Sequence, residues 1–258
     1  MTALAMVRIV EREAEVFRRL WRAFVFSNVV SPVLFLGAMG LGLGGLIDAR
    51  SRGIGGGLSY VEFIAPGLMA ANAMQSGAGM SLWPILGGMK WIRYFHGMVA
   101  TPVRARDVYW GELAWSGLRT AVTSSVFLVV ATLFGGIHSP WAVLAVPAAM
   151  LCALAFSAPL MAFSATQETD LGFPLVFRLG VMPLFLFSGT FFPVSQLPSA
   201  VRPLAAVSPL WHGVELCRAA ATGSFRFGPI VAHVAVLSAL VAAGAWWGTR
   251  TFERRLSP

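Results

Sequence analysis

Long apolar runs separated by short charged connections dominate the pattern of this chain. A helix that crosses a bilayer needs about 20 mainly apolar residues. The runs that reach this length lie at about 23–47, 60–83, 111–135, 140–166, 174–192 and 228–250. The pattern therefore predicts an all-α, polytopic membrane protein with six transmembrane helices within one domain, residues 23–250. The fifth run is the least regular because it is short and contains Pro174 and Pro183, which membrane helices tolerate when neighbours satisfy the freed carbonyls.

The first 22 residues differ from the rest because charged side chains interrupt every apolar stretch. This excludes a signal peptide, which needs an uninterrupted apolar core. Apolar side chains nevertheless recur at three- and four-residue spacing, at Met6, Val7, Val10, Ala14, Phe17 and Trp21. Residues 1–22 are therefore predicted to form an amphipathic helix in the membrane interface. A charged extension of the first transmembrane helix is the alternative.

The connection 84–110 is long enough to hold structure of its own. Its apolar side chains fall at helical spacing opposite Lys90 and Arg93, at Trp91, Tyr94, Phe95 and Met98. Thr101 followed by Pro102 is typical of an N-cap with proline in the first helical turn. We expect a short amphipathic helix from about Trp91 to Thr101 and then a new start into the third transmembrane helix.

The second long connection, 193–227, is too apolar for an ordinary solvated loop, and three X-Pro pairs prevent a continuous membrane-spanning helix. A re-entrant or interfacial helical hairpin fits this pattern. After Pro209 one helical stripe is apolar and another is polar. The apolar stripe holds Leu210, Val214, Cys217 and Ala221, and the polar stripe holds His212, Glu215 and Arg218.

Composition and charge support a membrane protein and set its orientation. Hydrophobic residues make up 57% of the chain and charged residues 12%, against about 45–50% and 25% in soluble domains. The net charge of +8 does not indicate nucleic-acid binding, because the arginines cluster beside apolar runs rather than on one face. Placing both termini in the cytoplasm leaves twelve cations inside and five outside. The 84–110 connection and the tail 251–258 are then cytoplasmic, and the 193–227 connection is external.

The sequence offers no catalytic site. A phosphate-binding loop needs a Gly-Lys-Ser/Thr end, whereas the sole lysine, Lys90, precedes Trp91. Carboxylates are not placed at matched depth for hydrolysis. His212 and Glu215 lie one helical turn apart, and a hydrogen-bonded pair is favoured over a metal site because further ligands are missing. We expect no enzyme activity, no metal and no bound cofactor in this chain.

Several motifs resemble type-2 ABC exporter permeases, most closely the lipooligosaccharide (nodulation-factor) branch. The resemblance covers nearly the whole chain and keeps the order of the family's motifs. It rests on 187–193, Gln196-Leu197-Pro198, 208–215 with Arg218, Met98–Val103 with Asp107 and Gly111-Glu112, and Tyr60, Phe63 and Pro66-Gly67-Leu68.

The resemblance implies a permease of the bacterial inner membrane that pairs with a second permease, as a homodimer or with a paralogue. Each permease would dock on a separate ATPase subunit, which uses ATP and Mg²⁺, and an amphipathic substrate would move outward. The coupling residues it implies are Trp91, Arg93, Tyr94, Thr101, Pro102, Arg104 and Asp107. The substrate exit it implies is lined by Trp211, His212, Glu215 and Arg218, for which a purely structural role is an equal alternative.

Two other functions stay open at this point. An ion-coupled secondary transporter would normally carry ionisable residues near the middle of the bilayer, and the chain offers few. A non-transporting membrane assembly protein uses the same small residues in its helix contacts. The cargo within the exporter hypothesis is a lipid-linked saccharide, a glycolipid or a hydrophobic drug.

Overall fold

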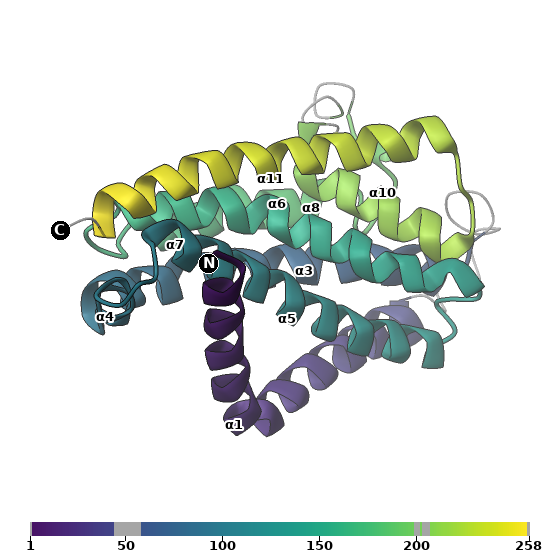
Figure 1. Cartoon of the computed structure of the whole chain (residues 1–258). Coiled ribbons are helices and arrows are strands. Elements are labelled where there is room, and N and C mark those ends of the chain that lie inside the picture. The colour runs from purple at the N-terminus through teal and green to yellow at the C-terminus, as the bar shows by residue number, and fades with distance from the viewer. Residues whose placement is uncertain (1, 44–57, 199–201, 203–206, 257–258) are drawn as a thin grey trace.

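The computed structural model describes residues 2–43, 58–198, 202 and 207–256, and these are almost entirely helical (Figure 1). The predicted all-α class is therefore confirmed. The elements in chain order are α1 (Thr2–Leu36), η1 (Gly37–Leu43), α3 (Tyr60–Leu86), η2 (Gly87–Trp91), α4 (Tyr94–Val99), α5 (Ala105–Leu133), η3 (Pro140–Leu144), α6 (Ala145–Thr166), α7 (Phe173–Leu175), η4 (Val176–Val181), α8 (Met182–Phe187), η5 (Val194–Gln196), α10 (Pro209–Thr222) and α11 (Phe227–Leu256).

Three helical segments of the described chain are long and apolar enough to cross a membrane. They are Ala105–Leu133, Pro140–Thr166 and Phe227–Leu256, and the apolar segment Phe173–Phe187 is shorter. The predicted number of six is not confirmed. Helix α3 has 27 residues, enough length to cross, but Asn72 and Gln75 dilute its apolar character. The predicted first span, 23–47, extends partly outside the described residues.

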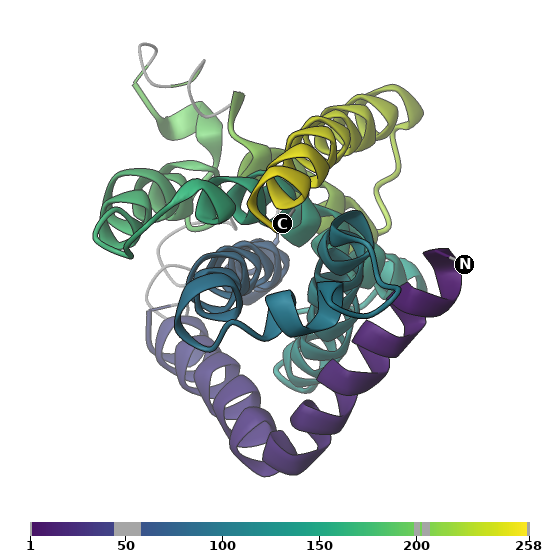
Figure 2. The ribbon, with the colours of Figure 1, turned by 60° about the vertical axis from the view of Figure 1, so that its left-hand side comes forward.

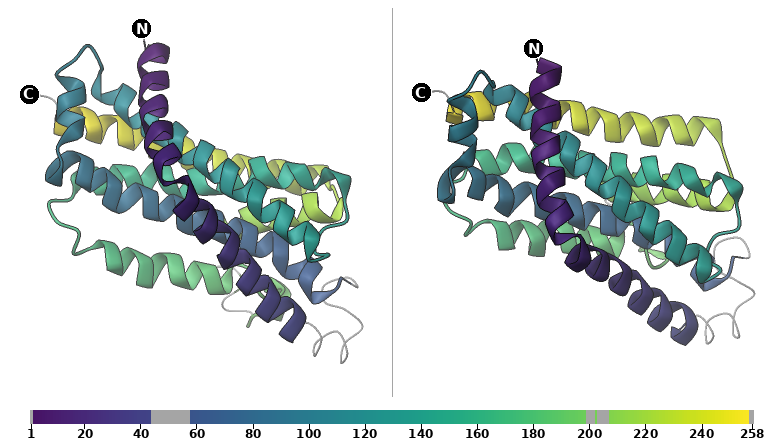
Figure 3. Two further views of the ribbon diagram at one scale, coloured as in Figure 1. Left: turned by 90° about the horizontal axis from the view of Figure 1, so that it is seen from below. Right: turned by 60° about the horizontal axis from the view of Figure 1, so that its bottom comes forward.

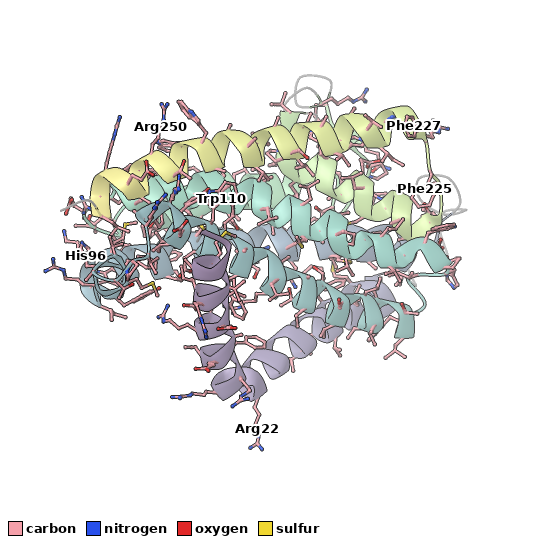
Figure 4. All side chains as sticks on the ribbon, viewed as in Figure 1. Arg22, His96, Trp110, Phe225, Phe227 and Arg250 are labelled. Atoms are coloured by element: carbon pink, nitrogen blue, oxygen red, sulfur yellow. The ribbon has the colours of Figure 1, made fainter. Side chains whose placement is uncertain are left out.

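Helix α1 continues across the predicted boundary at residue 22 without a break. It changes direction near Arg22, so that it forms a V along one side of the other helices (Figures 2 and 4). Its N-terminal part crosses α5 (Figure 3), where the ring centroids of Phe17 and Trp115 lie 5.9 Å apart. The charged N-terminal segment is therefore a helix that packs on the bundle, and its position in the membrane interface stays a prediction.

Helix α6 lies at the centre and packs against α3, α5, α10 and α11. Small residues permit this close packing. A Cβ atom on Gly77 of α3 would lie 2.8 Å from the carbonyl oxygen of Ala153. A Cβ atom on Gly244 of α11 would lie 2.5 Å from the backbone nitrogen of Pro159. Such close backbone approach is typical of membrane helices, which lack a hydrophobic driving force for association.

Candidate functional site

The connection 84–110 lies at the end of the bundle where α11 also ends (Figure 1). The predicted single helix from Trp91 to Thr101 is wrong in its extent. Trp91 ends η2, and Arg93 adopts a left-handed backbone conformation with φ of 59° before α4 begins at Tyr94. This conformation breaks the helix, because a side chain in the left-handed region cannot continue a right-handed helix.

The predicted N-cap at Thr101 is also wrong. The Thr101 hydroxyl donates to the carbonyl oxygen of Met98 at 2.6 Å and closes the turn after α4. Helix α5 begins at Ala105, and the Asp107 carboxylate accepts a hydrogen bond from the Arg104 backbone N–H at 3.3 Å. A carboxylate in the first helical turn satisfies free N–H groups and interacts favourably with the helix dipole. Asp107 is buried and therefore has a structural role in starting α5.

Phe95 holds α4 against the bundle. Its side chain is fully buried, and its ring contacts that of Phe252 of α11 with centroids 6.1 Å apart. A Cβ atom on Gly88 would lie 2.5 Å from the Phe95 ring, so only glycine fits there. The surrounding cluster draws on α1, α3, η2, α5, α6 and α11 through Ile9, Ile85, Met89, Val108, Tyr109, Leu113, Met161 and Leu256.

The outer surface of this connection combines apolar and cationic side chains. Trp91 is 55% exposed and Ile92 is 75% exposed, and Arg93 beside them is also exposed. Among the other predicted coupling residues, Thr101, Pro102 and Arg104 are exposed and Tyr94 is half-buried. The structure thus presents most of the predicted coupling residues on the surface, with Phe95 as their anchor.

The N-terminal helix touches this connection directly. The Arg12 guanidinium lies over the Tyr94 ring, 4.1 Å from its centroid, a favourable cation–π arrangement. Arg12 also pairs with Glu13 at 2.5 Å. Burial raises the pKa of Tyr94, the negative charges of Glu112 and Glu13 raise it further, and Arg12 lowers it. The Tyr94 hydroxyl therefore stays neutral at physiological pH.

An ion-pair cluster joins three distant segments at the same end, and sequence reasoning missed it. Lys90 Nζ donates to the Glu168 carboxylate at 2.6 Å and to its backbone carbonyl at 2.7 Å, and Arg255 pairs with the same carboxylate. Hydrogen bonds from Arg255 and Lys90 lower the pKa of Glu168 to about 2. The predicted topology places all three residues on one side of the membrane, and this was the feature of the sequence from which the cluster could have been predicted. We call these residues the Glu168 cluster.

Helix α10 lies toward the opposite end and confirms the predicted apolar stripe, because Leu210, Val214, Cys217 and Ala221 are all buried. Its 14 residues span about 21 Å, less than the hydrocarbon thickness of about 30 Å. The predicted hairpin 193–227 is not confirmed, since residues 199–201 and 203–206 lie outside the described part.

The predicted polar stripe of α10 does not face solvent freely, because His212 is buried and Glu215 and Arg218 are half-buried. His212 pairs with His233 of α11, with 2.7 Å between their Nδ1 atoms, and not with Glu215 as predicted. One of these nitrogens must donate and the other accept, so at least one ring is neutral. The Trp211 ring stacks edge-on against both imidazoles, with centroids 5.0 Å from each. Sequence reasoning missed His233 because it lies 21 residues from His212.

Arg218 joins α10 to the motif 187–193. It donates to Glu215 at 2.7 Å and to the Gly189 carbonyl at 2.9 Å, and its guanidinium lies 4.1 Å from the centre of the Phe63 ring. Gly189 has φ of +79°, a conformation that favours glycine. The four predicted exit residues therefore fall into two groups, Trp211 and His212 with His233, and Glu215 with Arg218. Of the four, His212 is buried and the other three are half-buried.

Among the described residues, no group of three or more His, Cys, Asp or Glu side chains is placed to hold a metal ion. Cys152 and Cys217 are both buried free thiols. Neither end of the described bundle therefore presents an assembled metal centre. The surfaces described above carry exposed apolar and charged side chains of the kind that bind partners or ligands.

Comparison with known proteins identifies the family. The model of the ABC-2 type transporter family matches residues 5–221. This chain belongs to the ABC-2 type transporter family. It is 29% identical over 234 residues to Nodulation protein J of Rhizobium leguminosarum bv. viciae, covering 91% of this chain and 88% of that protein. It is 27% identical over 247 residues to Nodulation protein J of Rhizobium meliloti strain 1021, covering 94% and 90%.

The family resemblance predicted from the motifs is confirmed. Membership makes this ABC-2 chain the membrane component of a transporter, in agreement with its long apolar helices. A third similar protein, Nodulation protein J of Rhizobium leguminosarum bv. trifolii, is 28% identical over 259 residues and covers 98% of this chain and 95% of its own length. The likeness thus extends through α11, beyond the region that the family model matches.

Proposed function

We propose that this chain is the permease subunit of an ATP-driven exporter in the bacterial inner membrane. It carries an amphipathic cargo outward, such as a lipid-linked saccharide, a glycolipid or a hydrophobic drug. ATP and Mg²⁺ are used by a separate ATPase subunit, and a second permease, identical or paralogous, completes the membrane part. Family membership and the similarity to Nodulation protein J support this proposal.

The observation that carries the proposal is the exposed surface of Trp91, Ile92 and Arg93 on a rigidly anchored base. Large exposed apolar side chains beside a cation are typical of interface centres. Phe95 anchors the base from below, and the Glu168 cluster ties it to α6 and α11. A push on this surface is therefore transmitted to several helices at once, as a rigid-body mechanism requires.

The N-terminal helix forms a second part of this surface in our proposal. Arg12 contacts Tyr94. Ile9 packs so closely on Gly111 of α5 that a Cβ atom on Gly111 would lie 2.8 Å from the Ile9 side chain. The helix and the connection 84–110 therefore present one composite face. In the orientation that we propose, with both termini in the cytoplasm, this face meets the ATPase, and the α10 network lies toward the exit.

Reconstituted flux tests the proposal. Proteoliposomes that contain the chain with a co-expressed ABC ATPase from the same genome are loaded with a fluorescent glycolipid, and its movement is followed. We expect movement that needs ATP and the ATPase and that persists when ionophores collapse the ion gradients. Movement that collapses with a gradient and needs no ATPase would establish the secondary-transporter alternative, and no movement under any condition would favour the assembly-protein alternative.

A further inference from the structure

A cavity lies between α10, the turn that follows it and the first turns of α11. It has a volume of about 310 Å³, and its polar lining includes Glu215, Arg218, Ser224, Arg226 and His233. This size is at the small end of ligand pockets, which run from about 300 to 1,000 Å³. It is large enough for a polar head group and too small for a whole lipid.

The charges around the cavity favour an anion. Glu215 is neutralised by Arg218, which it meets at 2.7 Å. Arg226 remains as an exposed cation, and in the described part of the chain its side chain has no ion-pair partner. The cavity therefore keeps one positive charge for a ligand.

Two further groups in the lining are suited to a ligand that carries oxygen atoms. The Nε of Arg218 is buried without an acceptor among the described residues, and a buried donor without a partner is costly. His233 uses Nδ1 toward His212 and keeps Nε2 for another partner. A phosphate or carboxylate with neighbouring hydroxyls would satisfy such donors.

An apolar stripe runs beside the cavity on the same helix. Arg226, Ile230 and His233 line the cavity at steps of four and three residues. Phe227, Val231 and Val234 each follow one of them and are 85%, 49% and 40% exposed. Helical geometry places these two sets on adjacent faces of α11, and Figure 4 shows Phe227 near the end of the bundle.

We propose that this cavity binds the anionic head group of an amphipathic lipid, whose chains lie along the Phe227, Val231 and Val234 stripe. Arg226 supplies the charge, and Arg218 and His233 donate hydrogen bonds to its oxygens. This inference rests on the proposed function. It specifies that the cargo, or a lipid that accompanies it at the exit, carries a negative charge.

Lipid binding to the purified chain in detergent tests this site. The probe is dioctanoyl phosphatidylglycerol, and its affinity is measured by native mass spectrometry. Because Arg226 supplies the charge that attracts the head group, Arg226→Gln should weaken binding at least tenfold. Arg226→Lys should keep most of the affinity. The matched control is Arg250→Gln, which removes an exposed cation near the other end of α11 and should leave the affinity unchanged.

Equal binding by Arg226→Gln and the unaltered chain would overturn the proposal. So would displacement of the probe by inorganic phosphate at the same concentration, because the site would then take a free anion rather than a lipid. Equal affinity for uncharged dioctanoylglycerol would overturn the role of the charge. The assay needs neither ATPase nor flux, so a failed head-group site with intact ATP-driven export is distinguishable from a failed exporter assignment.

Discussion

Replacing Trp91 by alanine should affect ATPase binding more than folding, because the Trp91 side chain is 55% exposed. A tryptophan buries up to about 250 Å² when it is covered, so a partner could cover about 140 Å² of Trp91. At about 25 cal/mol per Å², burial of this area contributes about 3.5 kcal/mol as an upper value. The costs of association lower the net effect. We expect Trp91→Ala to weaken ATPase binding by about 1–3 kcal/mol, roughly 5- to 150-fold in Kd.

The assay titrates the purified ATPase subunit onto immobilised, detergent-solubilised chain. The control variant is Trp141→Ala, since Trp141 is 59% exposed. It lies in η3, which leads into α6 at the opposite end of the bundle from α4. It should bind the ATPase like the unaltered chain. Both variants should unfold within a few degrees of the parent. Unchanged ATPase binding by Trp91→Ala, or an equal loss in both variants, would refute the coupling role of this surface.

Two predictions concern the packing beneath this surface. Glu168→Gln should lower the melting temperature in detergent at pH 7. The pKa of Glu168 is lowered from 4.5 to about 2 in the folded state, so its stabilisation is complete above pH 4.5 and is lost as the pH falls toward 2. The difference in melting temperature between variant and parent should therefore shrink over this range. A difference that stays constant with pH would contradict the ion-pair explanation. Gly248→Ala would place a methyl group 2.1 Å from the Tyr109 ring and should cost about 1–3 kcal/mol of stability. Gly228→Ala on the same helix meets nothing within 4 Å and should not destabilise, and equal melting temperatures for these two variants would contradict the close packing of α11 on α5.

Patterns that depend on neighbours along the chain were predictable. The apolar stripe of α10 follows from residues three and four apart, and the structure buries Leu210 and Val214 as expected. The apolar runs likewise predicted helices, because burial of a helix in lipid demands that every backbone group be satisfied within the helix. The family motifs predicted that the chain is the membrane component of an ABC-2 transporter, and the family match confirms this.

Features that depend on packing between distant segments were not predictable. His212 has a nearer possible partner in Glu215, yet the packing of α10 on α11 brings His233 to it. The left-handed conformation of Arg93 breaks the helix just before Phe95, which is buried against distant helices. The carboxylate of Asp107, rather than the hydroxyl of Thr101, caps the first turn of α5, because Thr101 closes the turn after α4 instead. Local propensity cannot specify these choices.

Site-specific cross-linking tests the central claim most directly. The two native thiols are buried, so Arg93→Cys introduces a thiol that a short bifunctional reagent can reach first. The account predicts that this thiol is cross-linked to the co-expressed ATPase in membranes, with a yield that changes when ATP is added. Trp141→Cys should give no such adduct. An ATPase adduct from Trp141→Cys and none from Arg93→Cys would contradict the account.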